Sequence, residues 1–187
     1  MKTVVFVCTV NRWRSPMAEY LFRDILKRKK PEFTKQIKIT SAGIIVDEEK
    51  ADLIKKRIEL PEPVFGYRPL VCVIYYLMKR GIDSSGHRSR ELTNKIAHSA
   101  DLIIGMVDKH KDIINKTYPM VKDKVVSLEE LSSPFQLPEI KNEPPGLMPP
   151  DKFCMLECNH WHVTDKAISM IENKLEEAMP KILNILM

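Results

Sequence analysis

One stretch near the N-terminus constrains this chain more than any other, TVVFVCTVNRWRSPMAE at residues 3–19. The apolar run Val4–Val7 is typical of a strand that is buried on both faces. A helix is predicted from Pro16, because Ser15 has the side chain of an N-cap and proline is favoured at the first helical position. The sequence therefore predicts a buried strand, a short loop and a helix in direct succession.

The segment between this strand and this helix runs from Cys8 to Arg14 with five residues between them (the Cys8 loop). A loop that closes onto a helix N-terminus points backbone N–H groups inward beside the positive end of the helix dipole, so an anion can bind there. A cysteine is activated as thiolate near positive charge, and an arginine offers a planar fork that matches two phosphate oxygens. These residue types predict nucleophilic attack on phosphorus. The simpler interpretation of Cys8 is a small buried side chain at a strand end.

Composition excludes several classes of protein. The 187 residues, 44% of them hydrophobic, predict one soluble globular domain covering 1–187. The net charge of +5, from 30 basic and 25 acidic residues, suits anionic substrates but is not clustered enough for nucleic acid. No stretch approaches the roughly 20 apolar residues of a membrane span, so no membrane partner is expected.

The cysteines favour a reducing compartment. The four of them are irregularly spaced, which is not typical of a secreted disulfide framework, and the N-terminus shows no signal-peptide pattern. A cytoplasmic location is therefore expected. It would keep the Cys8 thiol reduced.

The pattern along the chain predicts an α/β fold. The first helix should run from Pro16 to about Lys29, and Gln36–Ala42 alternates as a second strand that Gly43 ends. A strand, helix and strand at this spacing make a βαβ unit with a parallel sheet. The remaining predicted elements are a short exposed helix at 47–57, a helix at 69–79 with Val73, Ile74, Leu77 and Met78 inward, strands at 100–106 and 124–128, and a last helix from Asp165 to about Leu186. Together they predict a three-layer α/β/α sandwich with a four-stranded parallel sheet.

The stretch VFVCTVNRWRSPMAE resembles the low-molecular-weight protein tyrosine phosphatases, whose signature is V-C-x-G-N-x-C-R-S-P followed by a helix. Val10 stands where the family has Gly, and Trp13 stands where many members have a second Cys. The resemblance implies a phosphatase that hydrolyses phosphotyrosine-type phosphomonoesters through a cysteinyl-phosphate, with Cys8 as nucleophile and Arg14 as phosphate clamp. It also implies substrate contacts from the rest of the loop, namely Thr9, Val10, Asn11, Arg12, Trp13 and Ser15. No cofactor or metal is expected.

Two further segments resemble the same family. SAG at 41–43 is similar to its strand-two motif, and GIDSSGHRSREL at 81–92 to its G-I-x-x-S-x-H-x-[SA]-R segment. The resemblance implies a hydrogen-bond network of Asn11, Ser41 and His87 that supports the loop. From spacing alone, Ser41 would be a strand-end serine and His87 a surface histidine.

The reaction also needs a carboxylic acid that protonates the leaving group and then activates water. HWHVTDK at 160–166 resembles the family's W-x-x-x-D-P segment before the terminal helix, which favours Asp165 as this acid. Asp151 and Glu143 remain alternatives. Asp165 is equally suited to be the N-cap of the last helix.

The segment 132–158 is rich in proline, which predicts a long insertion loop. Trp13 and Trp161 could form an aromatic wall for a phosphoaryl group, or be partly buried loop residues. Arg12 at the mouth of the loop could favour acidic peptides.

Three alternative functions remain open at this stage. An arsenate reductase on the same scaffold would need two further cysteines after the third strand, where 100–118 has none. A metal site is conceivable at Cys154, Cys158, His160 and His162, although the spacing is not a common zinc pattern. If Val10 changed the backbone of the Cys8 loop, the protein would be a non-catalytic phosphate-binding module. The physiological substrate, whether phosphorylated protein or small phosphate ester, and the oligomeric state are not determined.

Overall fold

A computed structural model describes residues 1–45, 65–136 and 160–187, with the side chains of the last range from Val163 onward. Four parallel strands form one sheet in the order β2-β1-β3-β4. Their bounds are Lys2–Cys8 for β1, Ile37–Gly43 for β2, Leu102–Gly105 for β3 and Val125–Ser127 for β4. The predicted four-stranded parallel sheet is confirmed, and its register pairs Cys8 with Gly43.

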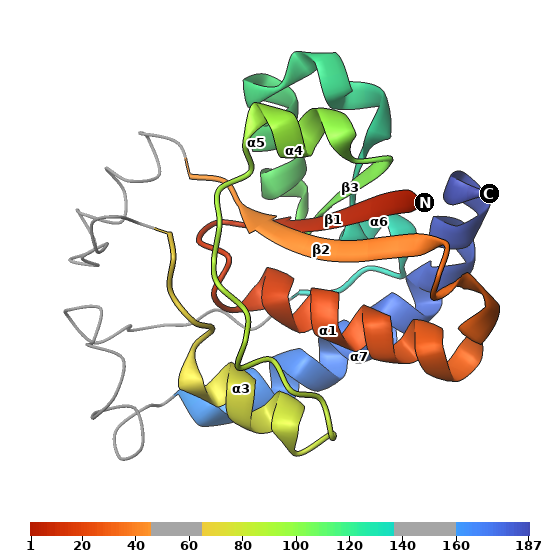
Figure 1. Cartoon of the computed structure of the whole chain (residues 1–187). Helices are drawn as coiled ribbons and strands as arrows, with labels where there is room; N and C mark the ends of the chain where they lie inside the picture. Colours follow the sequence, from red (N-terminus) through yellow and green to blue (C-terminus); the bar gives the residue numbers. More distant parts are fainter. Residues whose placement is uncertain (46–64, 137–159) are drawn as a thin grey trace.

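Helices cover both faces of the sheet (Figure 1). Helix α1 (Arg14–Lys29) and α7 (His160–Leu186) lie on one face, and α4 (Asn94–Ser99) and α5 (Asp108–Thr117) on the other. Strand β1 contributes to a hydrophobic core on each face of the sheet. Val4, Phe6 and Cys8 pack toward α1 and α7, while the alternate residues pack toward α4 and α5. This is the predicted α/β/α sandwich, and the strand at its centre ends at the candidate nucleophile.

The other described elements are shorter. They are the helices α3 (Val71–Met78) and α6 (Leu128–Leu131) and the 3-10 helices η1 (Pro31–Phe33) and η2 (Pro119–Lys124). Apolar residues at helical spacing along α1 and α7 are buried, among them Phe22 and Ile25 in α1 and Ile171 and Leu175 in α7. In α3 the prediction for Val73 and Leu77 is confirmed, but Met78 is 58% exposed. The helix predicted at 47–57 lies outside the described residues.

Two helix starts differ from the prediction. Helix α1 begins at Arg14 with Trp13 at the N-cap position, so Ser15 is a helical residue and not the cap. Helix α7 begins at His160, which places Asp165 inside the helix and not at its start. In both cases the local signal was a good capping residue, and the helix begins before it, by one residue for Ser15 and by five for Asp165.

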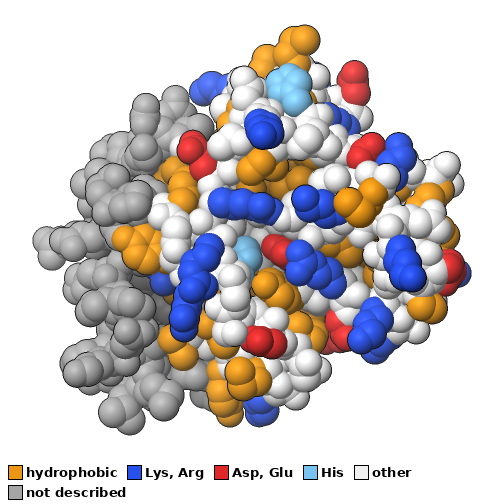
Figure 2. All heavy atoms as spheres, viewed as in Figure 1, with side chains coloured by type: hydrophobic (Ala, Val, Ile, Leu, Met, Phe, Trp, Pro, Cys, Tyr) orange, Lys and Arg blue, Asp and Glu red, His pale blue; other side chains and the backbone are white. Residues whose placement is uncertain are grey.

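Strand β2 is an edge of the sheet, and two arginines cover its outer side. Arg23 donates from Nε and Nη2 to the Ile39 carbonyl at 3.2 and 2.6 Å, and Arg90 donates from Nε to the Ser41 carbonyl at 2.8 Å. Lys and Arg side chains gather across this face of the molecule (Figure 2). Satisfied carbonyls and positive charge discourage another strand from pairing here. Among the described residues, no helix has the length and apolar character that crossing a membrane requires.

Candidate active site

Cys8 ends β1 and its side chain is 3% exposed. Its Sγ lies 3.0 Å from Ser15 Oγ, in the first turn of α1. Ser15 accepts a hydrogen bond from Asn11 Nδ2 at 2.9 Å, so its own proton is left to donate, either to Cys8 or to the Ala42 carbonyl at 3.3 Å. The shorter contact is the one to sulfur. A hydroxyl and the N-terminus of α1 therefore both lie beside the Cys8 sulfur.

Asn11 lies at the centre of the Cys8 loop and is fully buried. Its φ is +56°, in the left-handed region that Asn tolerates better than most residues. The side chain and carbonyl make four hydrogen bonds, from Nδ2 to Ser15 Oγ (2.9 Å) and Ser41 Oγ (2.8 Å), from the Arg90 backbone N–H to Oδ1 (3.0 Å), and between the carbonyl and His87 Nε2 (3.3 Å). The expected contacts of Asn11 with Ser41 and His87 are therefore present. They tie the loop to α1, to β2 and to the segment 87–90.

Glu19 extends this network and was missed by the sequence reasoning. Its Oε2 accepts the Ser41 hydroxyl at 2.5 Å and lies 3.7 Å from His87 Nδ1, while Oε1 pairs with Arg23 at 2.5 Å. Burial lowers the pKa of His87, and the nearby Glu19 carboxylate opposes that shift. The available signal was an acidic residue next to the apolar residues Met17, Ala18 and Leu21 of the predicted helix. In the structure Glu19 is 4% exposed.

Gly43 allows β2 to approach the loop closely. A Cβ at this position would lie 2.7 Å from the Thr9 carbonyl and 3.1 Å from the Asn11 nitrogen. The register of β1 and β2 brings this glycine beside Cys8, and Ile44 donates its N–H to the Cys8 carbonyl at 2.9 Å. Any larger side chain would therefore push against the loop backbone.

Val10 fits the loop without a strained backbone. Across the described part of the chain, positive φ at a non-glycine residue is confined to Asn11, so Val10 has an ordinary negative φ. The side chain of Arg12 donates from Nε to the Arg68 carbonyl at 3.1 Å and lies over the Tyr67 ring. On the opposite flank, Thr9 Oγ1 lies 3.3 Å from His110 Nε2 of α5.

A buried strand, a short loop and a cysteine beside a helix N-terminus are the arrangement that phosphoryl transfer through a cysteine requires. The sequence model of one family, described as low molecular weight phosphotyrosine protein phosphatase, matches residues 3–60 and 66–143. This chain belongs to that family.

Curated relatives agree with this assignment. A low molecular weight protein-tyrosine-phosphatase Ptp of Acinetobacter johnsonii is 32% identical over 145 residues, 72% of this chain and 81% of that one. A protein-arginine-phosphatase of Bacillus subtilis is 31% identical over 134 residues, 68% of this chain and 70% of that one. Both relatives are hydrolases of phosphorylated residues by name, and this chain is a phosphomonoester hydrolase of the same family.

Solved structures show the same fold. A low molecular weight protein tyrosine phosphatase from T. tengcongensis has a TM-score of 0.66 at 26% identity and covers 97% of this chain and 99% of that one. The arginine phosphatase YwlE of Geobacillus stearothermophilus has a TM-score of 0.68 at 22% identity, covering 98% of this chain and 94% of that one. The fold of this phosphatase therefore extends beyond the segment matched by the family model.

Trp13 occupies the position where many family members have a second cysteine, and it anchors the loop to α7. Its ring is 8% exposed and its Nε1 donates to Thr164 Oγ1 at 3.1 Å. The Thr164 hydroxyl in turn contacts the buried Cys72 sulfur at 3.4 Å. Little of the Trp13 ring is left for an aromatic wall, and the side chain of Trp161 lies outside the described residues.

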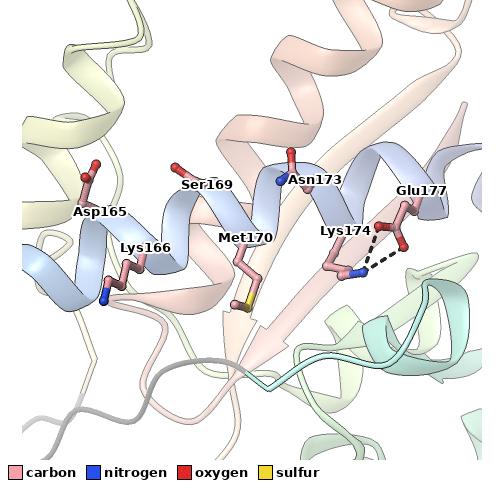
Figure 3. Close-up of a pocket in the computed structure, with 7 residues that line it drawn as sticks. All are labelled: Asp165, Lys166, Ser169, Met170, Asn173, Lys174 and Glu177. Carbon is pink, nitrogen blue, oxygen red and sulfur yellow. Dashed lines mark hydrogen bonds and ion pairs between the residues drawn. The ribbon is translucent and has the colours of Figure 1, made fainter.

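Asp165 follows Thr164 and lies on α7, where it lines a shallow hollow of about 510 Å³ with other residues of the same helix (Figure 3). Asp165 and Lys166 point to different sides of the helix. Burial raises the pKa of Tyr76, and the Asp165 carboxylate adds to this rise, which places Asp165 near α3. The other candidate acids, Glu143 and Asp151, lie outside the described residues, as do the side chains of the conceivable metal site at 154–162.

Proposed function

We propose that this protein hydrolyses phosphotyrosine-type phosphomonoesters through a cysteinyl-phosphate intermediate on Cys8. The observation that carries the proposal is the contact of Cys8 Sγ with Ser15 Oγ at 3.0 Å, at the start of α1 and beneath a loop held by Asn11. A phosphorylated protein or a small phosphate ester would be the substrate. The compartment we propose is the cytoplasm, where a reduced thiol persists.

In the first step, the Cys8 thiolate attacks phosphorus. A sulfur–phosphorus bond forms while the bond from phosphorus to the leaving oxygen breaks. The backbone N–H groups of the Cys8 loop and the Arg14 guanidinium hold the three equatorial oxygens, on which negative charge remains throughout the transfer. The positive end of the α1 dipole adds to this stabilisation.

In the second step, water attacks the phosphocysteine and releases inorganic phosphate. The Cys8 thiolate is now the leaving group, and Ser15 donates a hydrogen bond to it. The Ser15 hydroxyl already lies 3.0 Å from sulfur at rest, so it needs little reorganisation to donate when the charge returns there. Ser15 therefore assists the second step.

The general acid that we propose is Asp165, with Asp151 and Glu143 as the competing carboxyls. Support for Asp165 comes from its neighbour Thr164, which accepts a hydrogen bond from Trp13 of the Cys8 loop. The acid would protonate the leaving oxygen in the first step and take a proton from water in the second. Its position inside α7 means that a rigid helix, not a loop, would carry it.

The proposal is tested by hydrolysis of p-nitrophenyl phosphate between pH 5 and 7. Cys8→Ser should abolish turnover while inorganic phosphate still binds. Asp165→Asn should lower kcat by roughly a hundred-fold or more, while the exposed Asp112→Asn in α5 serves as matched control and leaves kcat unchanged.

Parallel variants identify the acid. If Asp165→Asn keeps wild-type kcat and Asp151→Asn or Glu143→Gln loses it, the acid belongs to the segment before α7. Turnover that survives in Cys8→Ser would refute the cysteinyl-phosphate. For the active wild-type enzyme, rates of hydrolysis of phosphotyrosine and phosphoarginine peptides, compared at equal concentration, would identify the preferred phosphorylated residue.

A further inference from the structure

His110 is a buried histidine that borders the Cys8 loop and has no role in the reaction described above. It lies in the first turn of α5 and is 2% exposed. Its Nε2 is 3.3 Å from the hydroxyl of Thr9, the residue that follows the nucleophile. Gly105 at the end of β3 makes this packing possible, because a Cβ there would lie 2.8 Å from the Lys111 nitrogen and 3.2 Å from His110 Cβ.

The imidazole of His110 is neutral at physiological pH. Burial lowers its pKa to about 3, and the positive charges of Arg14 and Lys109 add to this shift. Arg14, the proposed phosphate clamp, is thus one of the charges that act on the ring. One ring nitrogen therefore carries a proton, and the other is an acceptor.

The surroundings indicate which nitrogen carries the proton. Among the described residues, His110 Nδ1 is a buried polar atom without a hydrogen-bond partner. A proton on Nδ1 would leave a buried N–H without an acceptor, an arrangement that folded proteins rarely tolerate. A proton on Nε2 is instead donated to Thr9 Oγ1. Because the Thr9 oxygen accepts this hydrogen bond, the Thr9 hydroxyl proton is left to be donated to another acceptor.

We propose that His110 is a positioning residue for phosphoryl transfer, which donates from Nε2 to Thr9 and thereby directs the Thr9 hydroxyl proton to an oxygen of the bound phosphoryl group. The proposal rests on the function proposed above. It adds a side-chain donor, controlled from α5, to the backbone N–H groups of the Cys8 loop. Because the imidazole is neutral, it supplies this donor without adding a positive charge beside Arg14.

A double-mutant cycle tests the coupling of the two residues. His110→Leu and Thr9→Val should each lower kcat/KM for p-nitrophenyl phosphate about three- to ten-fold, as expected for one lost hydrogen bond. The kcat/KM of the double variant should be no lower than that of the less active single variant, because both changes remove the same interaction. His110→Gln, whose Nε2 can still donate, should recover activity to within about two-fold of wild type.

Controls separate positioning from a purely structural role. The exposed His98→Leu in α4 should leave kcat/KM unchanged. Thermal unfolding identifies variants that are merely unstable, and if His110→Leu does not fold, Thr9→Val and Thr9→Ser carry the test alone. The proposal would be overturned if the fold-losses of kcat/KM in the two single variants multiply in the double variant. Wild-type activity in Thr9→Val would also overturn it.

Nitrogen NMR of the wild-type protein gives an independent test. The His110 ring should show the Nε2–H tautomer and no titration between pH 5 and 8, whereas an Nδ1–H tautomer would refute the proposal. If the wild-type enzyme has no turnover, the proposed function fails, but the same cycle can be measured on the dissociation constant of inorganic phosphate. Coupled losses of phosphate affinity would still support the role of His110, and independent losses would refute it.

Discussion

The two flanks of the Cys8 loop are held in different ways. On the β2 side, Asn11 makes four hydrogen bonds, and the Ser41 that it contacts is bonded in turn to Glu19. On the β3 side, Thr9 contacts the His110 ring, whose second nitrogen has no hydrogen-bond partner in the described part of the chain. The difference teaches that the first flank sets the loop backbone, while the second adjusts the direction of one donor. Substitutions on the β2 side should therefore lower kcat/KM and the free energy of unfolding far more than substitutions on the β3 side.

The largest effect is expected for Asn11→Ala. Alanine loses the side-chain hydrogen bonds and does not readily adopt a φ of +56°. We expect kcat/KM to fall roughly a hundred-fold and the free energy of unfolding by about 2–4 kcal/mol. Steady-state kinetics and urea unfolding measure both, with the exposed Asn94→Ala as control. Activity within three-fold of wild type would show that the β2 flank does not set the loop.

Gly43→Ala should have the next largest effect, because the new Cβ presses on the backbone of both Thr9 and Asn11. We expect the free energy of unfolding to fall by about 1–3 kcal/mol and kcat/KM by roughly ten-fold. Gly86→Ala is a matched control, since its Cβ would meet no atom within 4 Å. Equal effects of the two substitutions would contradict the close approach of β2 to the loop.

The His110 flank can be examined through acid stability. In the folded protein the pKa of His110 is about 3, whereas in the unfolded chain it is near 6.5. Between these values the unfolded chain binds more protons, so stability falls as the pH is lowered. From pH 7 to 5 this residue should cost the wild type up to about 2 kcal/mol. His110→Gln should lose less over that range in urea unfolding, whereas His98→Gln should match the wild type. A loss in His110→Gln equal to that of the wild type would mean that the imidazole is not held neutral.

The smallest effect is expected for Thr164→Val, which removes the hydroxyl between Trp13 and Cys72. The free energy of unfolding should fall by about 1 kcal/mol, the value of one buried hydrogen bond, with kcat/KM within two-fold of wild type. The exposed Thr117→Val, at the end of α5, is the control. A large loss of activity would mean that α7 helps to shape the loop, and that both flanks depend on a third support.

Most of the fold could be predicted because its signals are local. The apolar run of β1 and the helical spacing of α1 each lie within a few residues of sequence, and the order of strands and helices implies a parallel sheet. Helix starts were less accurate. Ser15 and Asp165 are good capping residues, yet both lie inside helices, because a capping preference worth about 1 kcal/mol does not by itself fix where a helix begins.

The sequence by itself determined the order of Cys8, the loop, Arg14 and the helix after them, since neighbours in the chain form this unit. Only the tertiary structure decided what supports it. Glu19 meets Ser41 across the sheet and helix layers, Thr9 meets His110 at a separation of 101 residues, and Trp13 meets Thr164 at a separation of 151. Such contacts follow from strand register and helix packing. No local periodicity encodes them, because each depends on where two distant segments are brought together.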